Sequence, residues 1–184
     1  MLREEPEMLV PRAPEGERLN LLLPSPIGEL GLTLRGTVVT ALTIAPTDAL
    51  RERYTPFTEL DGDEFLEEVV GRFSEYFAGA RTSLELEHDL SDFELSSFAR
   101  RVFRETVKIP YGRTRTYNKV AALAGRPEAY RQVLAILVAN PIPILIPCHR
   151  VVTHKSGIGS FVGGQDRKRW LMAMEKEALK EQDR

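Results

Sequence analysis

Apolar and polar residues alternate along three short segments near the start of the chain. Residues 19–23 are rich in leucine, residues 29–34 alternate with a period of two, and residues 37–44 are rich in β-branched side chains. A period of two is typical of a strand with one buried face, and β-branched residues favour strands. The segments are separated by residues 24–28 and by the tight turn Arg35-Gly36. This pattern predicts three consecutive strands in an antiparallel meander.

A helical spacing follows, after a polar, proline-containing connection at residues 47–61. Large apolar residues recur at every fourth position of residues 63–78: Phe65, Val69, Phe73 and Phe77. Acidic residues occupy the other positions, and Gly79 follows the last turn, as is common at a helix C-terminus. We therefore expect an amphipathic helix at residues 63–78.

The second half of the chain is mostly helical in pattern. One helix is predicted to begin at Ser96, and a second covers residues 117–124 between the capping residue Thr116 and Gly125. Pro127 is expected in the first turn of a third helix. Two helices joined by a glycine turn have the spacing of a helix-turn-helix, although many helical hairpins bind nothing.

These elements predict a fold of the α/β (α+β) class. An N-terminal three-stranded antiparallel sheet with helices is followed by a mostly helical C-terminal part with a winged-type helix-turn-helix. We expect a disordered extension at residues 1–17, an N-terminal α/β scaffold domain at residues 18–92, and a functional C-terminal domain at residues 93–184. Residues 166–179 form the last predicted helix.

A proline-punctuated apolar run ends at the only cysteine of the chain, Cys148. Residues 144–146 are predicted to form a short buried strand, because prolines on both sides hold the chain extended. A lone cysteine is more often a small buried hydrophobic residue than a nucleophile. The adjoining His149 favours a reactive thiol here, because that chemistry requires a lowered thiol pKa and a positioned base.

Charge is distributed unevenly along the chain, although the formal net charge is only -2. Residues 93–184 contain 17 Lys and Arg against 8 Asp and Glu, whereas residues 1–92 contain 8 against 19. A basic half is typical of a nucleic-acid-binding protein, and ordinary solvated surface is the alternative. A single cysteine forms no internal disulfide, and no apolar run is long enough for a membrane span. We expect no membrane partner and a location in the cytoplasm, or in the nucleus of a eukaryote.

The run from Asn140 to Val152 resembles the active-site motif of the O6-alkylguanine-DNA alkyltransferases, also called methylated-DNA-protein-cysteine methyltransferases. The family pattern is an asparagine, a proline-punctuated apolar strand and then Pro-Cys-His-Arg-Val, and every element is present. The similarity extends from about Phe98 to Glu175. It implies stoichiometric transfer of an alkyl group from O6-alkylguanine in double-stranded DNA to a monomeric protein, without a cofactor. Some relatives bind a structural zinc ion through cysteines and histidines in the N-terminal half, but no cysteine precedes Cys148, so no metal site is carried over.

The resemblance implies a role for four residues in the transfer step. Cys148 is the nucleophile, His149 takes its proton through a bound water, and Glu175 orients that histidine. Asn140 matches the hinge asparagine that braces the active-site strand. No step regenerates the thiol, because a thioether is a poor leaving group, so each molecule is used once.

The same resemblance implies a set of residues that bind DNA and a flipped base: Tyr117, Arg131, Pro143, Val151, Phe161 and Val162. Arg131 fills the space that the base leaves, and the Val151 carbonyl reads the amino group of the base. The chain departs from the family at Phe161, where most members have a tyrosine that donates a hydrogen bond to the guanine oxygen. The backbone N–H of Val162 remains available as a donor. A second departure concerns the bulky residues near Arg131: Tyr130, Gln132 and Leu134.

Two alternative functions remain open from the sequence. Relatives of the alkyltransferases bind alkylated DNA without repairing it, but those proteins lack the active-site cysteine. A Cys-His hydrolase would turn over its substrate repeatedly. The mass of the protein after exposure to methylated DNA distinguishes these alternatives from alkyl transfer.

Overall fold

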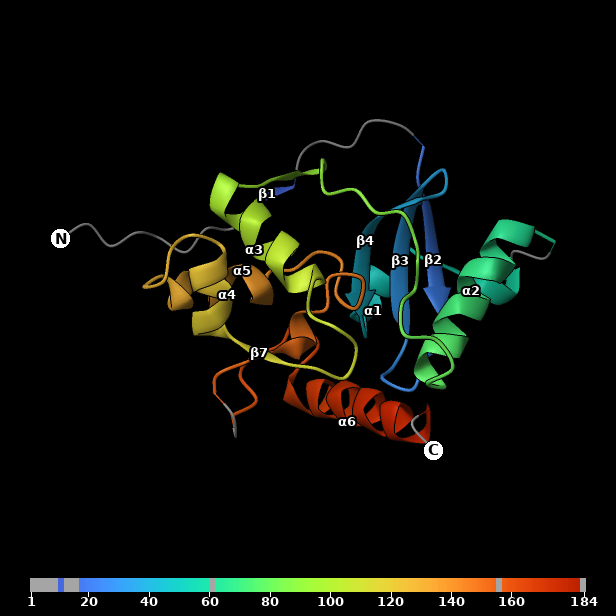
Figure 1. Ribbon diagram of the computed structural model, residues 1–184. Coiled ribbons are helices and arrows are strands. Elements are labelled where there is room, and N and C mark those ends of the chain that lie inside the picture. The colour runs from blue at the N-terminus through green and yellow to red at the C-terminus, as the bar shows by residue number, and fades with distance from the viewer. Residues whose placement is uncertain (1–9, 12–16, 60–61, 155–156, 183–184) are drawn as a thin grey trace.

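The computed structural model describes residues 10–11, 17–59, 62–154 and 157–182. Figure 1 shows the sheet of the N-terminal half beside a group of helices from the C-terminal half. The long last helix runs along both parts. The predicted fold class, mixed α/β with a mostly helical C-terminal part, is confirmed.

The predicted meander is present as three antiparallel strands: β2 (Leu19–Leu23), β3 (Leu30–Arg35) and β4 (Val38–Ile44). Leucines face one another across it, with Leu21 opposite Leu32 and Leu32 opposite Leu42. Cross-strand apolar pairs stabilise a sheet, and burial of one face specifies its register. Leu21, Leu32 and Leu42 are all buried. Gly31 and Thr33, which lie between the β3 leucines, are buried as well, so β3 is buried on both faces and not on one face as its alternation predicts.

The sheet contains a fourth strand that the prediction missed. The connection after β4 forms a short helix, a short strand and a 3-10 turn: α1 (Asp48–Arg51), β5 (Thr55–Pro56) and η1 (Phe57–Glu59). β5 lies parallel to β2 at the edge of the sheet, giving the order β4-β3-β2-β5. A two-residue strand that contains proline shows no periodicity, so only its pairing with β2 reveals it.

The predicted helix at residues 63–78 is present as α2 (Glu64–Phe77). The side chain of Asp63 caps it by accepting hydrogen bonds from the backbone N–H groups of Phe65 and Leu66. Its buried face includes Val69 and Phe73, and also Tyr76, which reaches across to the C-terminal half. Figure 1 shows α2 beside β2.

Four helices form most of the C-terminal half: α3 (Ser97–Val107), α4 (Tyr117–Leu123), α5 (Tyr130–Val138) and α6 (Gln165–Gln182). The predicted cap at Thr116 is present, because its side chain accepts from Lys119 N, and the side chain of Ser96 caps α3 in the same way by accepting from Ala99 N. The predicted start of the third helix is wrong. Pro127 lies in a turn, and α5 begins three residues later. Proline suits a turn as well as a first helical turn, so the sequence does not separate them.

Only Val10, Pro11 and Glu17 of the extension predicted at residues 1–17 lie among the described residues. Val10–Pro11 form β1, which pairs with β6 (Phe93–Glu94), and the disordered extension itself remains a prediction. Their partner is distant in sequence, and a local pattern does not indicate such a pairing. A second short pair, β7 (Arg115–Thr116) and β8 (Val151–Val152), is parallel and joins the start of α4 to the segment after Cys148.

One buried apolar cluster includes side chains from both halves of the chain, among them Leu42, Phe77, Val133 and Leu171. The backbone also links them, because Leu42 N donates to Pro141 O at 2.8 Å. Because the two halves share this cluster, the division into two domains between residues 92 and 93 remains a prediction. The segment that carries Cys148 is packed against strand β4 of the N-terminal sheet.

Candidate active site

The backbone before Cys148 forms a tight turn, so the strand predicted at residues 144–146 is wrong. Ile146 N donates to Ile142 O at 3.0 Å, and Ile144 has a φ of 76°. A β-branched residue rarely adopts this left-handed conformation, which costs about 1–3 kcal/mol and persists only where the surroundings impose it. Ile144 is buried as predicted, but an apolar run does not distinguish a buried turn from a buried strand.

Asn140 holds this turn closed. Its side-chain oxygen accepts from Ile142 N at 3.1 Å, and its Nδ2 donates to Ile146 O at 2.9 Å. The same Nδ2 donates to Cys148 Sγ at 3.1 Å. The sequence placed Asn140 at a hinge, and the structure brings it into direct contact with the sulfur.

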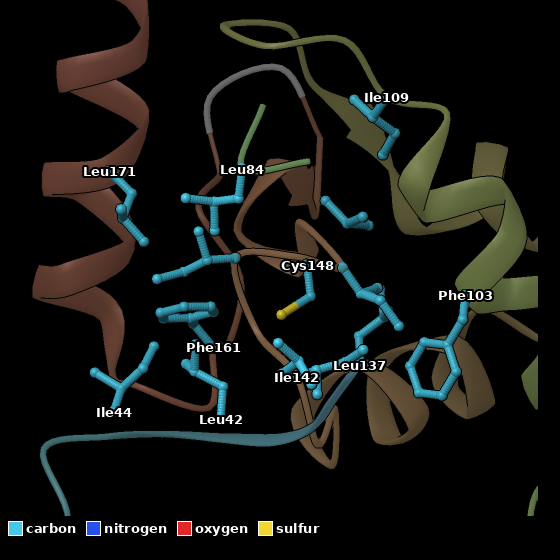
Figure 2. Packing of buried hydrophobic residues seen from close by; sticks show 14 of the residues in the cluster. Leu42, Ile44, Leu84, Phe103, Ile109, Leu137, Ile142, Cys148, Phe161 and Leu171 are labelled. Atoms are coloured by element: carbon cyan, nitrogen blue, oxygen red, sulfur yellow. The ribbon is translucent and has the colours of Figure 1, made fainter. Parts of the chain in front are cut away.

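Cys148 begins the 3-10 turn η2 (Cys148–Arg150), and its side chain is 2% exposed. Figure 2 shows it within the buried apolar cluster, together with Ile142 and Phe161. Burial raises the pKa of the thiol to about 11, although the hydrogen bond from Asn140 and the charge of Lys168 oppose this shift. The lowered pKa expected from the sequence is therefore not observed, because desolvation disfavours the thiolate. The resting thiol is protonated at pH 7 and requires a base.

His149 follows directly and is fully buried. Its Nε2 lies 2.8 Å from Glu175 Oε1, and its ring contacts Phe161 edge-on with centroids 6.2 Å apart. Burial lowers the pKa of His149 against the opposing effect of Glu175, so the ring is neutral at pH 7. Because a carboxylate accepts, Nε2 carries the proton. Nδ1 is then the basic nitrogen, and it has no hydrogen-bond partner among the described residues.

Glu175, on α6, is the centre of a buried hydrogen-bond network. Besides His149, its carboxylate accepts from three groups: Tyr76 Oη at 2.7 Å, Gly112 N at 2.8 Å and Arg150 Nη2 at 2.9 Å. Burial by itself would raise the pKa of Glu175, but the hydrogen bond from His149 and the guanidinium of Arg150 outweigh it and lower the pKa to about 2. The carboxylate is therefore ionised and fixes the histidine ring.

Three members of this network had no role in the sequence-based prediction. Arg150 belongs to the Pro-Cys-His-Arg-Val motif and so carried a signal. Gly112 lies in a short Pro-Tyr-Gly segment, whose composition indicates only a turn. Tyr76 lies in the helix regarded as scaffold and carried none. Burial and the charge of Glu175 raise the pKa of Tyr76, so its hydroxyl remains a donor.

Lys168 is a further residue that the sequence did not single out. Its ammonium is completely buried and donates to Val151 O at 2.5 Å and to Ser160 O at 3.0 Å. Burial lowers the pKa of Lys168 to about 8. Tyr117 Oη also donates to Ser160 O, at 3.2 Å, and the Lys168 ammonium lies 5.7 Å from the Tyr117 ring centroid. Lys168 thus joins β8, the start of α4 and the loop before Phe161.

The other residues predicted to contact a flipped base differ in their exposure. Pro143 is buried in the turn before Cys148, and Phe161 is 7% exposed, whereas Val162 is 43% exposed. Gly159 has a φ of 73°, and a Cβ there would lie 2.8 Å from the Tyr117 ring. The loop therefore passes directly over Tyr117, which no side chain larger than hydrogen would allow without displacement.

Arg131 lies apart from these residues. It is exposed at the second position of α5, and Arg131 Nε donates to Tyr130 Oη at 3.2 Å. The helices around it are braced from α3, because Arg101 Nε donates to Ala124 O at 2.7 Å. Other exposed basic residues lie before α4, within it and in the turn that follows it: Arg113, Lys119 and Arg126. This surface has the charge that a DNA backbone requires.

Neither a metal site nor a membrane span is found in the part of the chain that the structure describes. No group of three His, Cys, Asp or Glu side chains there could hold a metal ion. Likewise, no described helix is long and apolar enough to cross a membrane.

Comparisons with known proteins agree with the motif. Residues 97–177 match a family model described as 6-O-methylguanine DNA methyltransferase, DNA binding domain. The chain is similar to the methylated-DNA–protein-cysteine methyltransferase of Mycolicibacterium paratuberculosis, with 39% identity over 152 residues that cover 83% of this chain and 88% of that protein. A human protein of the same name is 34% identical over 168 residues, covering 85% and 80%.

Solved structures of methyltransferases are also similar to this chain. The crystal structure of Mycobacterium tuberculosis O6-methylguanine methyltransferase has a TM-score of 0.74 and 34% identity, covering 88% of this chain and 94% of that chain. The M. tuberculosis OGT in complex with DNA has a TM-score of 0.73 and 35% identity, covering 86% and 93%.

Proposed function

The chain belongs to the methylated-DNA–protein-cysteine methyltransferase family, and we propose that it repairs O6-alkylguanine in DNA by moving the alkyl group onto Cys148. One observation carries this proposal. The only thiol of the chain accepts a hydrogen bond from Asn140 and is followed by a neutral histidine whose Nε2 is held by an ionised carboxylate. This arrangement follows the nucleophile, base and orienter pattern of covalent catalysis.

The proton moves before or during the transfer. Nδ1 of His149 takes the proton of Cys148 through one water, and the resulting imidazolium is stabilised by Glu175. The thiolate then attacks the alkyl carbon, a carbon–sulfur bond forms, and the carbon–oxygen bond to guanine breaks. The guanine leaves as its anion and takes back one proton, so the net change is exchange of the thiol hydrogen for the alkyl group. The thioether is stable, and each molecule reacts once.

The flipped base occupies a pocket next to the thiol. Tyr117 contacts it through its hydroxyl, Pro143 packs on it, and the Val151 carbonyl accepts from its amino group. That carbonyl already accepts from Lys168 and has a second lone pair for the base. Phe161 stacks without donating, so the N–H of Val162 is the donor to the guanine oxygen.

Residues 93–184 act as the DNA-binding and alkyltransferase domain on the scaffold of residues 18–92. The basic surface of α4 and α5 binds the duplex backbone, and Arg131 enters the stack from the minor groove. One chain carries one thiol and one such surface, so a monomer suffices. A free thiol and a DNA substrate fit the cytoplasm, or the nucleus of a eukaryote.

Intact-protein mass spectrometry tests the proposal. After incubation with a duplex that contains one O6-methylguanine, the protein should gain one methylene per chain, and Cys148→Ala should gain none. Repeated loss of methyl groups from excess duplex would indicate a hydrolase. Binding of the duplex without an adduct would indicate a lesion-binding protein, and either result would overturn the proposal.

A further inference from the structure

Three bulky side chains surround Arg131 at the start of α5, and the structure separates them. Leu134 packs against the buried apolar cluster, and Gln132 is half-buried. Tyr130 is 43% exposed. Only Tyr130 of these three therefore presents a large side chain to solvent on this surface.

Tyr130 and Arg131 form a contact that their spacing does not favour. Consecutive residues on a helix point in different directions and do not normally face each other. Here Arg131 Nε donates to Tyr130 Oη at 3.2 Å, and the guanidinium carbon lies 5.7 Å from the Tyr130 ring centroid. A guanidinium at this distance from a ring centroid is attracted to the aromatic ring, so the two side chains stabilise each other's position.

We propose that Tyr130 is a positioning residue for Arg131, holding the guanidinium ready for insertion while its own ring stacks against the duplex beside the flipped base. This inference rests on the proposed function, in which Arg131 enters the DNA stack. In this proposal, the exposed ring of Tyr130 binds the base pair that has lost its stacking partner at the lesion.

Two physical effects support this role. A free arginine side chain loses much rotational freedom when it is immobilised, and a hydrogen bond to a neighbouring side chain removes part of that freedom beforehand. The base pair next to an extruded nucleotide loses a stacking partner, and aromatic rings stack on bases without regard to sequence. Both effects change the binding of a duplex and leave the reaction with a free base unaffected.

The opposite possibility is steric: the ring of Tyr130 would hold α5 away from the minor groove. The two ideas predict opposite signs for removal of the ring. Single-turnover alkyl transfer, measured against protein concentration, distinguishes them, because it gives the apparent Kd for the duplex and the maximal rate separately.

Three variants are compared on an O6-methylguanine duplex and on free O6-methylguanine base. Tyr130→Ala should raise the apparent Kd for the duplex about tenfold and leave the rate with the free base unchanged. Tyr130→Phe keeps the ring and loses the hydroxyl, so it should raise the Kd about threefold. In an Arg131→Ala background, Tyr130→Phe should have no effect, because the hydroxyl acts through the guanidinium.

Val138→Ala is the matched control, because Val138 is 38% exposed at the other end of the same helix. This variant should change neither the Kd for the duplex nor the rate with the free base. Equal or tighter duplex binding by Tyr130→Ala would overturn the inference in favour of steric obstruction. An equal loss of the alkyl-transfer rate with duplex and with free base would mean that Tyr130 only supports the fold. If the wild-type protein accepts no methyl group from either substrate, the proposed function fails as well, whereas the other outcomes leave it intact.

Discussion

Glu175 and Arg131 are charged side chains that we assign to one reaction, yet their surroundings are opposite. Glu175 is 1% exposed and accepts hydrogen bonds from four residues: Tyr76, Gly112, His149 and Arg150. Arg131 is exposed and contacts its neighbour Tyr130. A buried charge depends on its partners for stability as well as for function, whereas an exposed one can be changed with little effect on the fold.

The comparison extends to the reactions that each region controls. The network around Glu175 influences the ionisation of His149, the base that we propose for Cys148, so in the proposed function it affects every substrate that reaches the thiol. In the same proposal, the start of α5 affects only a duplex substrate, because a free base needs no flipping. Substrate choice therefore separates the two regions experimentally.

The largest change in the free energy of unfolding is expected for Glu175→Gln. The guanidinium of Arg150 would remain buried without a carboxylate, so the free energy of unfolding should fall by about 3–5 kcal/mol. Urea unfolding measures this loss. Glu177→Gln is the control, because Glu177 lies exposed on the same helix and pairs with Lys180. A loss no greater than that of the control would contradict the buried network.

The same variant should change the acid stability. The pKa of Glu175 is lowered from 4.5 to about 2, so the unfolded chain takes up this proton first as the pH falls. The stabilisation by Glu175 is complete above pH 4.5 and is lost as the pH approaches 2. Glu175→Gln should remove this part of the decline in stability, and Glu177→Gln should retain it.

His149→Ala should slow alkyl transfer about a hundredfold or more on duplex and free base alike, because a general base is lost. The affinity for duplex DNA should not change, since His149 is fully buried. Single-turnover rates together with binding constants test this. A variant that binds poorly but reacts at the normal rate when saturated would exclude the base role.

A smaller and more selective effect is expected for Arg131→Ala. Repair of the duplex should slow about tenfold or more, while the reaction with free O6-methylguanine base should be nearly unchanged, because only the duplex has a gap to fill. The ratio of the two rates is the measurement. Equal losses on both substrates would mean that Arg131 supports the fold and is not inserted.

The smallest change in the rate of alkyl transfer is expected for Phe161→Tyr. A hydroxyl at this position can donate to the guanine oxygen as it becomes negative, and one such hydrogen bond corresponds to a rate gain of about threefold to tenfold. The rate at saturating substrate should rise on both duplex and free base. Val162→Ala is the control, because it keeps the backbone N–H. A slower reaction in Phe161→Tyr would show that the pocket has no room for the hydroxyl.

Local patterns correctly predicted much of the fold. The meander of β2 to β4, helix α2, the helix that follows Ser96 and the cap at Thr116 follow from periodicity and from short-range hydrogen bonds, which depend on neighbouring residues. The errors involve segments whose state depends on distant partners. β5 exists through its pairing with β2, and the strand predicted at residues 144–146 is a turn that Asn140 closes.

The sequence was enough to identify the family and to predict Cys148 as the nucleophile, because Pro-Cys-His-Arg-Val is a contiguous motif. Only the tertiary structure decided how these groups are ionised. The packing of both halves buries Cys148 and raises its pKa to about 11, and it brings Tyr76 from the N-terminal half to Glu175. Ionisation depends on burial and on charges that are close in space but distant in sequence. For that reason the motif identified a thiol, and the fold determined that it requires a base.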